Sequence, residues 1–206
     1  MTSPNILLIM TDEERYPPPY EGAELQAFRK EQLTARERIR QGGLELHRHY
    51  AGSMACTPSR ATLFTGQYPS LHGVSQTDGT AKSATDPAMR WLDPDEVPTL
   101  GDWFRAGGYQ THYRGKWHVS HADLLVPGGH ESLMASDADG RPIPEAVAAY
   151  RKADRLGPFG FSGWIGREPH GAAKDNSGTV RDGVYAEQVT DLFGQLAGAR
   201  ADGPWL

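Results

Sequence analysis

The stretch "CTPSRATLFTG", Cys56 to Gly66, contains the only cysteine of this 206-residue chain. Pro58 favours a helix start, because proline fits the first turn of a helix, and the residues at 61–64 can continue that turn. Cys56 is therefore predicted at or just before a helix N-terminus, where free amides and the helix dipole attract anions. Arg60 adds a fixed positive charge. The stretch thus predicts an anion site beside a thiol.

A lone cysteine has plainer interpretations. Free cysteines are commonly small buried apolar side chains, and this interpretation stays open for Cys56. A cysteine-phosphatase site is disfavoured, because those enzymes have a longer Cys-to-Arg spacing and a glycine-rich phosphate loop. Catalysis by a Cys–His pair is open in principle, since the chain has eight histidines, but no local signature for it is present.

The rest of the chain alternates strand-like with helix-like segments. The apolar run "NILLIM", residues 5–10, is unbroken and predicts a buried parallel strand. Propensity and paired glycines predict further helices and strands: helices at 23–41, 100–106 and 182–196, and strands at 44–50, at 109–113 and from 205 onward. Residues 120–180 are predicted to be rich in loops. This alternation indicates an α/β fold.

Polar clusters follow the predicted strands, at the edge where α/β sheets bind ligands. They are Thr11-Asp12-Glu13, the Cys56 segment and Lys116-Trp117-His118. We expect one active site to be assembled from them. Taken singly, Asp12 can cap a turn and Lys116 can be a solvated surface charge. His118 with His121 resembles a metal-binding pair, but no third ligand with metal-site spacing is visible.

The Cys56 segment resembles the sulfatase family of the alkaline-phosphatase superfamily. In that family the cysteine of Cys-x-Pro-x-Arg is oxidised to formylglycine. Two more elements are similar and occur in the same order: "NILLIMTDE" at 5–13 and "GYQTHYRGKWH" at 108–118. The chain departs from the pattern at Glu13, where a second Asp is common, and at Arg114, where a small or apolar residue is usual.

The resemblance implies an alkaline-phosphatase-like three-layer sandwich, with a mostly parallel sheet and helices on both faces. Residues 1–206 are expected to form the N-terminal part of a single catalytic domain, truncated, with the C-terminal remainder missing. An isolated chain of this kind is expected to have little or no activity.

The resemblance also implies a sulfuric ester hydrolase that releases inorganic sulfate. Formylglycine at position 56 would hydrate to a diol, one hydroxyl of which attacks sulfur while the other later expels sulfate. A divalent cation, Ca²⁺ first and Mg²⁺ or Mn²⁺ otherwise, would be held by oxygen ligands from Asp12, Glu13 and the modified Cys56. The resemblance implies three further roles. Arg60 would contact the diol, and Lys116 would contact the sulfate. His118 would hydrogen-bond the formylglycine or help to eliminate the sulfate.

Two alternatives remain. The first is a phosphonate monoester or phosphodiester hydrolase, because some relatives use formylglycine to attack phosphorus. The second is an inactive truncated remnant. The implied partners are a small-molecule sulfate ester and a formylglycine-generating enzyme.

Composition bears on partners and location. The net charge of −5 disfavours nucleic acid and anionic membranes as partners. The chain has no membrane-length apolar run, no positively charged leader and no second cysteine for a disulfide, so we expect a soluble cytoplasmic protein.

Overall fold

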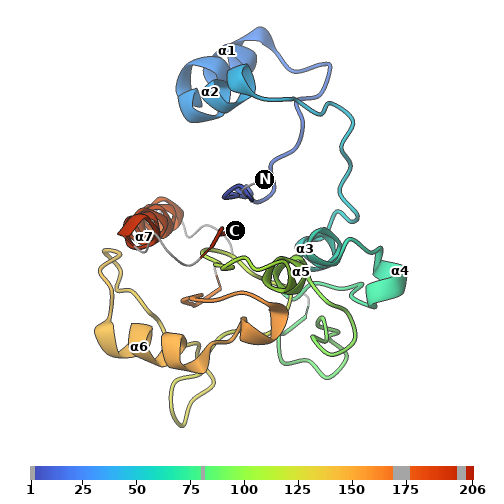
Figure 1. The fold of residues 1–206 in the computed structure, drawn as a ribbon. Helices are drawn as coiled ribbons and strands as arrows, with labels where there is room; N and C mark the ends of the chain where they lie inside the picture. The colour runs from blue at the N-terminus through green and yellow to red at the C-terminus, as the bar shows by residue number, and fades with distance from the viewer. Residues whose placement is uncertain (1–2, 80–81, 169–176, 199–202) are drawn as a thin grey trace. The chain divides into compact units, whose positions relative to one another are not determined.

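A computed structural model describes residues 3–79, 82–168, 177–198 and 203–206 (Figure 1). The chain forms two compact units. The larger contains residues 1–9 and 52–206, and the smaller contains residues 10–51. In the described ranges, no helix combines the length and the apolar character needed to cross a membrane.

The smaller unit contains a proline-rich loop and two helices, α1 (Ala23–Gln32) and α2 (Thr34–Gly42). The sequence predicts one helix here, but the chain leaves the helical conformation at Leu33, with φ −93° and ψ 53°. The strand predicted at 44–50 is wrong. These residues are all exposed and include a turn, because a strand is stable only beside a neighbouring strand.

The larger unit contains the remaining helices: α3 (Cys56–Thr65), α4 (Pro69–His72), α5 (Leu100–Ala106), α6 (Pro144–Ala153), the 3₁₀ helix η1 (Gly157–Phe159) and α7 (Ser177–Gly198). The helix predicted to start around Pro58 and the helices predicted at 100–106 and 182–196 are confirmed by α3, α5 and α7. Helix α6 lies where we predict loops, and residues 169–176 of that segment lie outside the described residues. The sequence does carry a local indication of α6: Ala146 and Tyr150 are spaced i, i+4, so they lie on one face of the helix, and both are buried.

Segments predicted as strands lie side by side in the larger unit, although in the described ranges they form isolated bridges rather than a sheet. The backbone N–H of Ile6 donates to Trp205, and residues 110–112 exchange hydrogen bonds with 204–206 at 2.9 Å. Residues 111–113 in turn bond to Ser162 at 3.0 Å. The bridges at Gln110–Trp205 and His112–Ser162 are parallel. This pairing agrees with the α/β class, while the three-layer sandwich stays a prediction.

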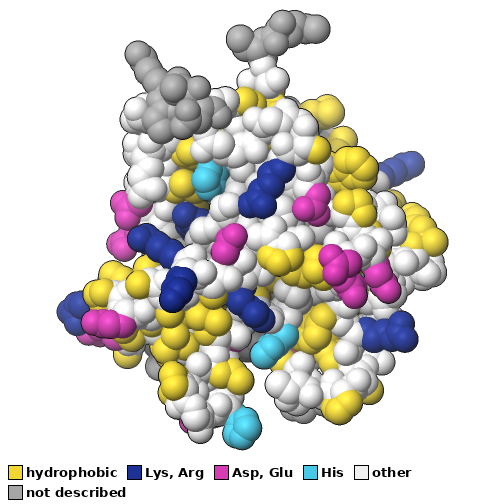
Figure 2. Space-filling model, turned by 60° about the horizontal axis from the view of Figure 1, so that its bottom comes forward, with side chains coloured by type: hydrophobic (Ala, Val, Ile, Leu, Met, Phe, Trp, Pro, Cys, Tyr) yellow, Lys and Arg dark blue, Asp and Glu magenta, His cyan; other side chains and the backbone are white. Residues whose placement is uncertain are grey.

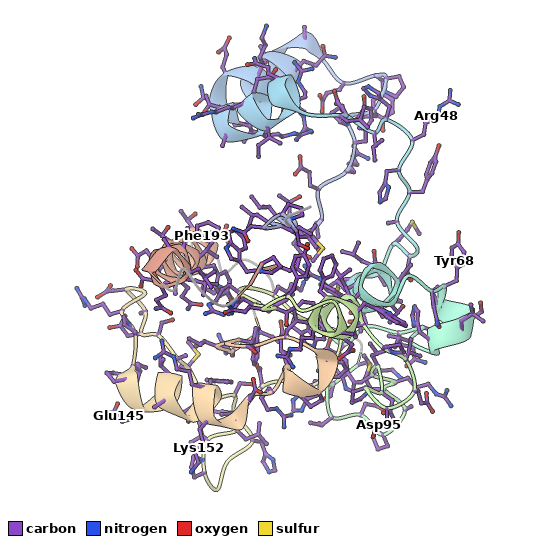
Figure 3. The ribbon with its side chains drawn as sticks, viewed as in Figure 1. Arg48, Tyr68, Asp95, Glu145, Lys152 and Phe193 are labelled. Carbon is purple, nitrogen blue, oxygen red and sulfur yellow. The ribbon has the colours of Figure 1, made fainter. Side chains whose placement is uncertain are left out.

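The burial predicted for the first strand is not found. Leu7, Leu8 and Ile9 are between 51% and 67% exposed. An apolar strand is buried only when helices or sheets cover both of its faces. Helix α7 packs on the bridged residues 204–206. The ring centroid of its Phe193, labelled in Figure 3, lies 5.3 Å from that of Trp205.

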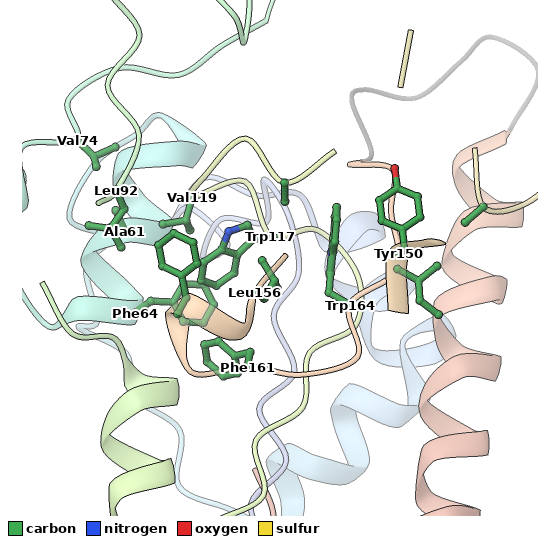
Figure 4. Packing of buried hydrophobic residues seen from close by; sticks show 14 of the residues in the cluster. Ala61, Phe64, Val74, Leu92, Trp117, Val119, Tyr150, Leu156, Phe161 and Trp164 are labelled. Carbon is green, nitrogen blue, oxygen red and sulfur yellow. The ribbon is translucent and has the colours of Figure 1, made fainter. Parts of the chain in front are cut away.

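An aromatic core joins the Cys56 helix to the Lys116–His118 segment (Figure 4). Phe64 at the end of α3 packs on the fully buried Trp117 with ring centroids 5.0 Å apart. Phe159 and Phe161 pack on the same indole at 5.3 and 5.8 Å. Burying large aromatic rings contributes strongly to stability, so these contacts fix the two polar segments in place.

Candidate active site

Cys56 is the first residue of α3, which confirms its predicted position at a helix N-terminus. Ala55 caps the helix with an extended backbone, and no side chain fills the cap. Pro58 is the third helical residue, where its missing N–H costs no helical hydrogen bond. The half-buried thiol therefore lies beside free amides at the positive end of a helix dipole.

Thr77 lies against this helix start. Its hydroxyl oxygen is 3.3 Å from the Cys56 sulfur and 3.0 Å from the Thr57 hydroxyl. The sequence gives no local signal for Thr77, because it reaches the site from a loop after α4.

Arg60 joins the Cys56 helix to the Lys116 segment. Its guanidinium is buried and donates through Nη1 to the Lys116 carbonyl oxygen at 2.5 Å. The Tyr113 hydroxyl donates to the same oxygen at 2.6 Å. Arg60 thus brings a positive charge into the site and also holds the backbone of the predicted sulfate-contacting residue.

His118 completes the group. Its side chain is 3% exposed, and its ring bonds to the carboxylate of Asp78, whose side chain is 6% exposed. Burial lowers the pKa of His118, but the hydrogen bonds to Asp78 and Cys56 outweigh burial and raise it to about 9. The His118 bond in turn lowers the pKa of the Cys56 thiol from 9.0 to about 6, against the opposing effect of burial. The pair therefore favours a thiolate beside an imidazolium at neutral pH.

Two more buried carboxylates lie behind His118, and sequence analysis does not single them out. Glu168 accepts the backbone N–H groups of Trp117 and His118, at 3.1 and 2.7 Å. Asp123 accepts the backbone N–H of Glu168 at 2.8 Å. These residues, with Asp78 and His118, line a small cavity of about 70 Å³.

A second, more open cavity is lined by residues of the smaller unit alone. It measures about 610 Å³ and is lined by the 16–21 loop and by α1 and α2. None of the predicted site residues lines it. On the face that Figure 2 shows, side chains of Lys and Arg, of Asp and Glu, and of hydrophobic residues all lie at the surface.

The predicted metal ligands belong to different units: Asp12 and Glu13 to the smaller unit and Cys56 to the larger. Over the described ranges, no group of three or more His, Cys, Asp or Glu side chains is arranged to hold a metal ion. Asp12 and Glu13 are exposed residues of the smaller unit, and their assignment as ligands stays a prediction. His118 and His121 do not form a metal centre either; both contact the Trp91 ring, with centroids 6.0 and 6.5 Å away.

Comparison with known proteins identifies the family of the chain. Residues 4–206 match the sulfatase family, and the chain therefore belongs to that family. It is 33% identical over 118 residues to steryl-sulfatase of Homo sapiens, which is 56% of this chain and 19% of that protein. It is 32% identical over 130 residues to the uncharacterized sulfatase YidJ of Escherichia coli, covering 62% and 22%. It is 29% identical over 167 residues to N-acetylgalactosamine-6-sulfatase of Sus scrofa, covering 76% and 31%. The chain thus spans less than a third of the length of each of these relatives.

Proposed function

We propose that the protein containing these residues is a sulfuric ester hydrolase that releases inorganic sulfate, with Cys56 matured to formylglycine. The observation that carries this proposal is the connection of four predicted residues within one unit. Cys56 bonds to His118, and Arg60 bonds to the backbone of Lys116. Membership of the sulfatase family supports the same reaction.

The charges around Cys56 suit a tetrahedral anion. The amides at the start of α3, the buried Arg60 guanidinium and a protonated His118 all favour negative charge at this place. Formylglycine supplies the nucleophilic hydroxyl of its hydrated form. The His118 ring already bonds to position 56, so it is placed to hydrogen-bond the formylglycine diol. In its neutral form it would accept the proton that the second hydroxyl loses as sulfate is expelled. We assign Lys116 to the sulfate and Arg60 to the nucleophile.

We further propose Asp12 and Glu13 as ligands of a divalent cation, together with the modified Cys56. Carboxylate oxygens are hard donors that suit Ca²⁺ best, and Mg²⁺ or Mn²⁺ next. Since Ca²⁺ takes roughly six to eight oxygens, further donors have to complete the site. A bound cation would neutralise sulfate oxygens and acidify the nucleophile.

The substrate we propose is a small-molecule sulfate ester, and the maturation partner is a formylglycine-generating enzyme in the cytoplasm. The names of the relatives refer to a steryl sulfatase and a 6-sulfatase of an amino sugar, which differ in the alcohol part. The proposal therefore concerns the sulfate group and leaves the alcohol open.

Parallel assays on an aryl sulfate and an aryl phosphonate monoester test this proposal. The full-length protein is co-expressed with a formylglycine-generating enzyme. We expect faster turnover of the sulfate, and loss of about a thousandfold or more in Cys56→Ala, as for other catalytic nucleophiles. Faster turnover of the phosphonate would favour the phosphonate hydrolase instead. Full activity of Cys56→Ala would contradict both.

A further inference from the structure

We propose that Glu168 is a positioning residue of this site, which holds the Trp117–His118 peptide so that the His118 ring faces Cys56. The proposal rests on the proposed function for its kinetic consequences. Its structural basis is independent of that function.

Glu168 accepts two hydrogen bonds from successive backbone N–H groups. One carboxylate oxygen of Glu168, Oε2, accepts the Trp117 N–H at 3.1 Å, and Oε1 accepts the His118 N–H at 2.7 Å. Successive N–H groups pointing to one side form a concavity that binds anions, and a left-handed residue commonly completes it. His118 is such a residue, with φ 53°.

This backbone conformation needs support. A non-glycine residue in the left-handed region is disfavoured, because its Cβ crowds the following carbonyl. In this conformation the buried Glu168 carboxylate accepts hydrogen bonds from both the Trp117 and the His118 N–H groups. Burial raises the pKa of Glu168 to about 7, opposed by the backbone bonds from His118 and Trp117, so burying this carboxylate is itself costly. A purely apolar side chain would avoid that cost but leave the two N–H groups without an acceptor.

Glu168 is itself fixed in place. Its N–H donates to the Asp123 carboxylate at 2.8 Å, and its side chain is buried behind the Lys116–His118 turn. The turn is then held on both sides, by Arg60 and Tyr113 at the Lys116 carbonyl and by Glu168 at the next two N–H groups. With the backbone fixed in this way, the ring of His118 reaches both Asp78 and Cys56.

The test is a double-mutant cycle in the full-length, matured protein with an aryl sulfate as substrate. In Glu168→Gln one of the two accepting oxygens is replaced by an NH₂ group, which cannot accept a hydrogen bond from the backbone N–H that it faces. We expect kcat to fall about ten- to hundredfold, as for a displaced catalytic group, with KM changed less than about twofold. In a His118→Ala background the same change should cost less than about threefold, because the effect passes through His118. Glu145→Gln, on the exposed face of α6, is the matched control (Figure 3).

A second readout needs no turnover. In protein labelled with ¹⁵N-histidine, the His118 imidazole signal, assigned by its loss in His118→Ala, should shift in Glu168→Gln and stay in Glu145→Gln. An inactive wild type with this shift would refute the sulfatase proposal and leave the positioning role standing. Equal losses of kcat in both backgrounds, or an unchanged His118 signal, would overturn the positioning role. If Glu168→Gln fails to fold, Glu168→Asp replaces it, and failure of both to fold would show a purely structural role instead.

Discussion

Cys56, His118 and Asp78 form a chain of hydrogen bonds in which each group changes the charge of the next. Asp78 stabilises the protonated imidazole, and the imidazole stabilises the thiolate. In the unmodified protein this makes Cys56 an acidic thiol. In the matured protein the same charges would act on the oxygen atoms at that position.

This acidity predicts how unmodified Cys56 reacts. The thiolate is the species that is alkylated, so with a pKa of about 6 the rate should already be near its maximum at neutral pH and fall as the pH drops below 6. In His118→Ala the midpoint should move up toward the ordinary 9.0. Iodoacetamide labelling, followed at the tryptic peptide of residues 49–60, measures both. Thr77→Val, which removes a weaker contribution, should move the midpoint less. A midpoint near 9.0 in the unmutated protein would contradict the hydrogen-bonded chain.

The sequence predicts only part of this site. Cys56 and Arg60 share one helix turn and Lys116 and His118 share one short motif, so local patterns identify them. Asp78 and Glu168 lie 40 and 50 residues from His118 and reach it from loops. No spacing rule connects residues so far apart, and only the folded chain brings them together.

At the scale of elements, the junction of α5 with η1 leaves almost no space between two backbones. Thr99 caps α5 and donates its hydroxyl to the Phe159 carbonyl at 2.6 Å. Gly160 has φ 74°, and a Cβ there would lie 2.2 Å from the Asp102 nitrogen. Gly66, which ends α3 with φ 68°, has open space at the same position.

These two glycines predict different costs of substitution. Gly66→Ala should lower the free energy of unfolding by about 1–2 kcal/mol, the cost of a left-handed alanine. Gly160→Ala should lower the free energy of unfolding by the same amount and by about 1–3 kcal/mol more, because its Cβ would overpack the contact. Urea unfolding of the two variants beside the unmutated protein measures both. Equal losses would show that the α5–η1 contact is looser than described.

Helices and strands differ in how far the sequence predicts them. Helices α3, α5 and α7 are predicted because their hydrogen bonds and their end signals are local. The strand at 44–50 is not found, and residues 109–113 form bridges through partners at 162 and 204–206. Strand formation depends on neighbours distant in sequence, which an apolar pattern does not reveal.

At the scale of the whole molecule, the aromatic core around Trp117 places the Cys56 helix and the Lys116–His118 turn in one rigid arrangement. The smaller unit carries Asp12 and Glu13, the carboxylates proposed for the cation. The chain spans less than a third of the relatives compared here, and the proposed activity belongs to the full-length protein.

The central claim is that Cys56 is matured to formylglycine. The measurement that tests it most directly is mass spectrometry of the tryptic peptide of residues 49–60, from full-length protein co-expressed with a formylglycine-generating enzyme. We expect an aldehyde at position 56, identified by its mass and by hydrazide capture, and none in Cys56→Ala. A peptide that carries only the free thiol would contradict the claim, because the proposed sulfatase would then have no nucleophile.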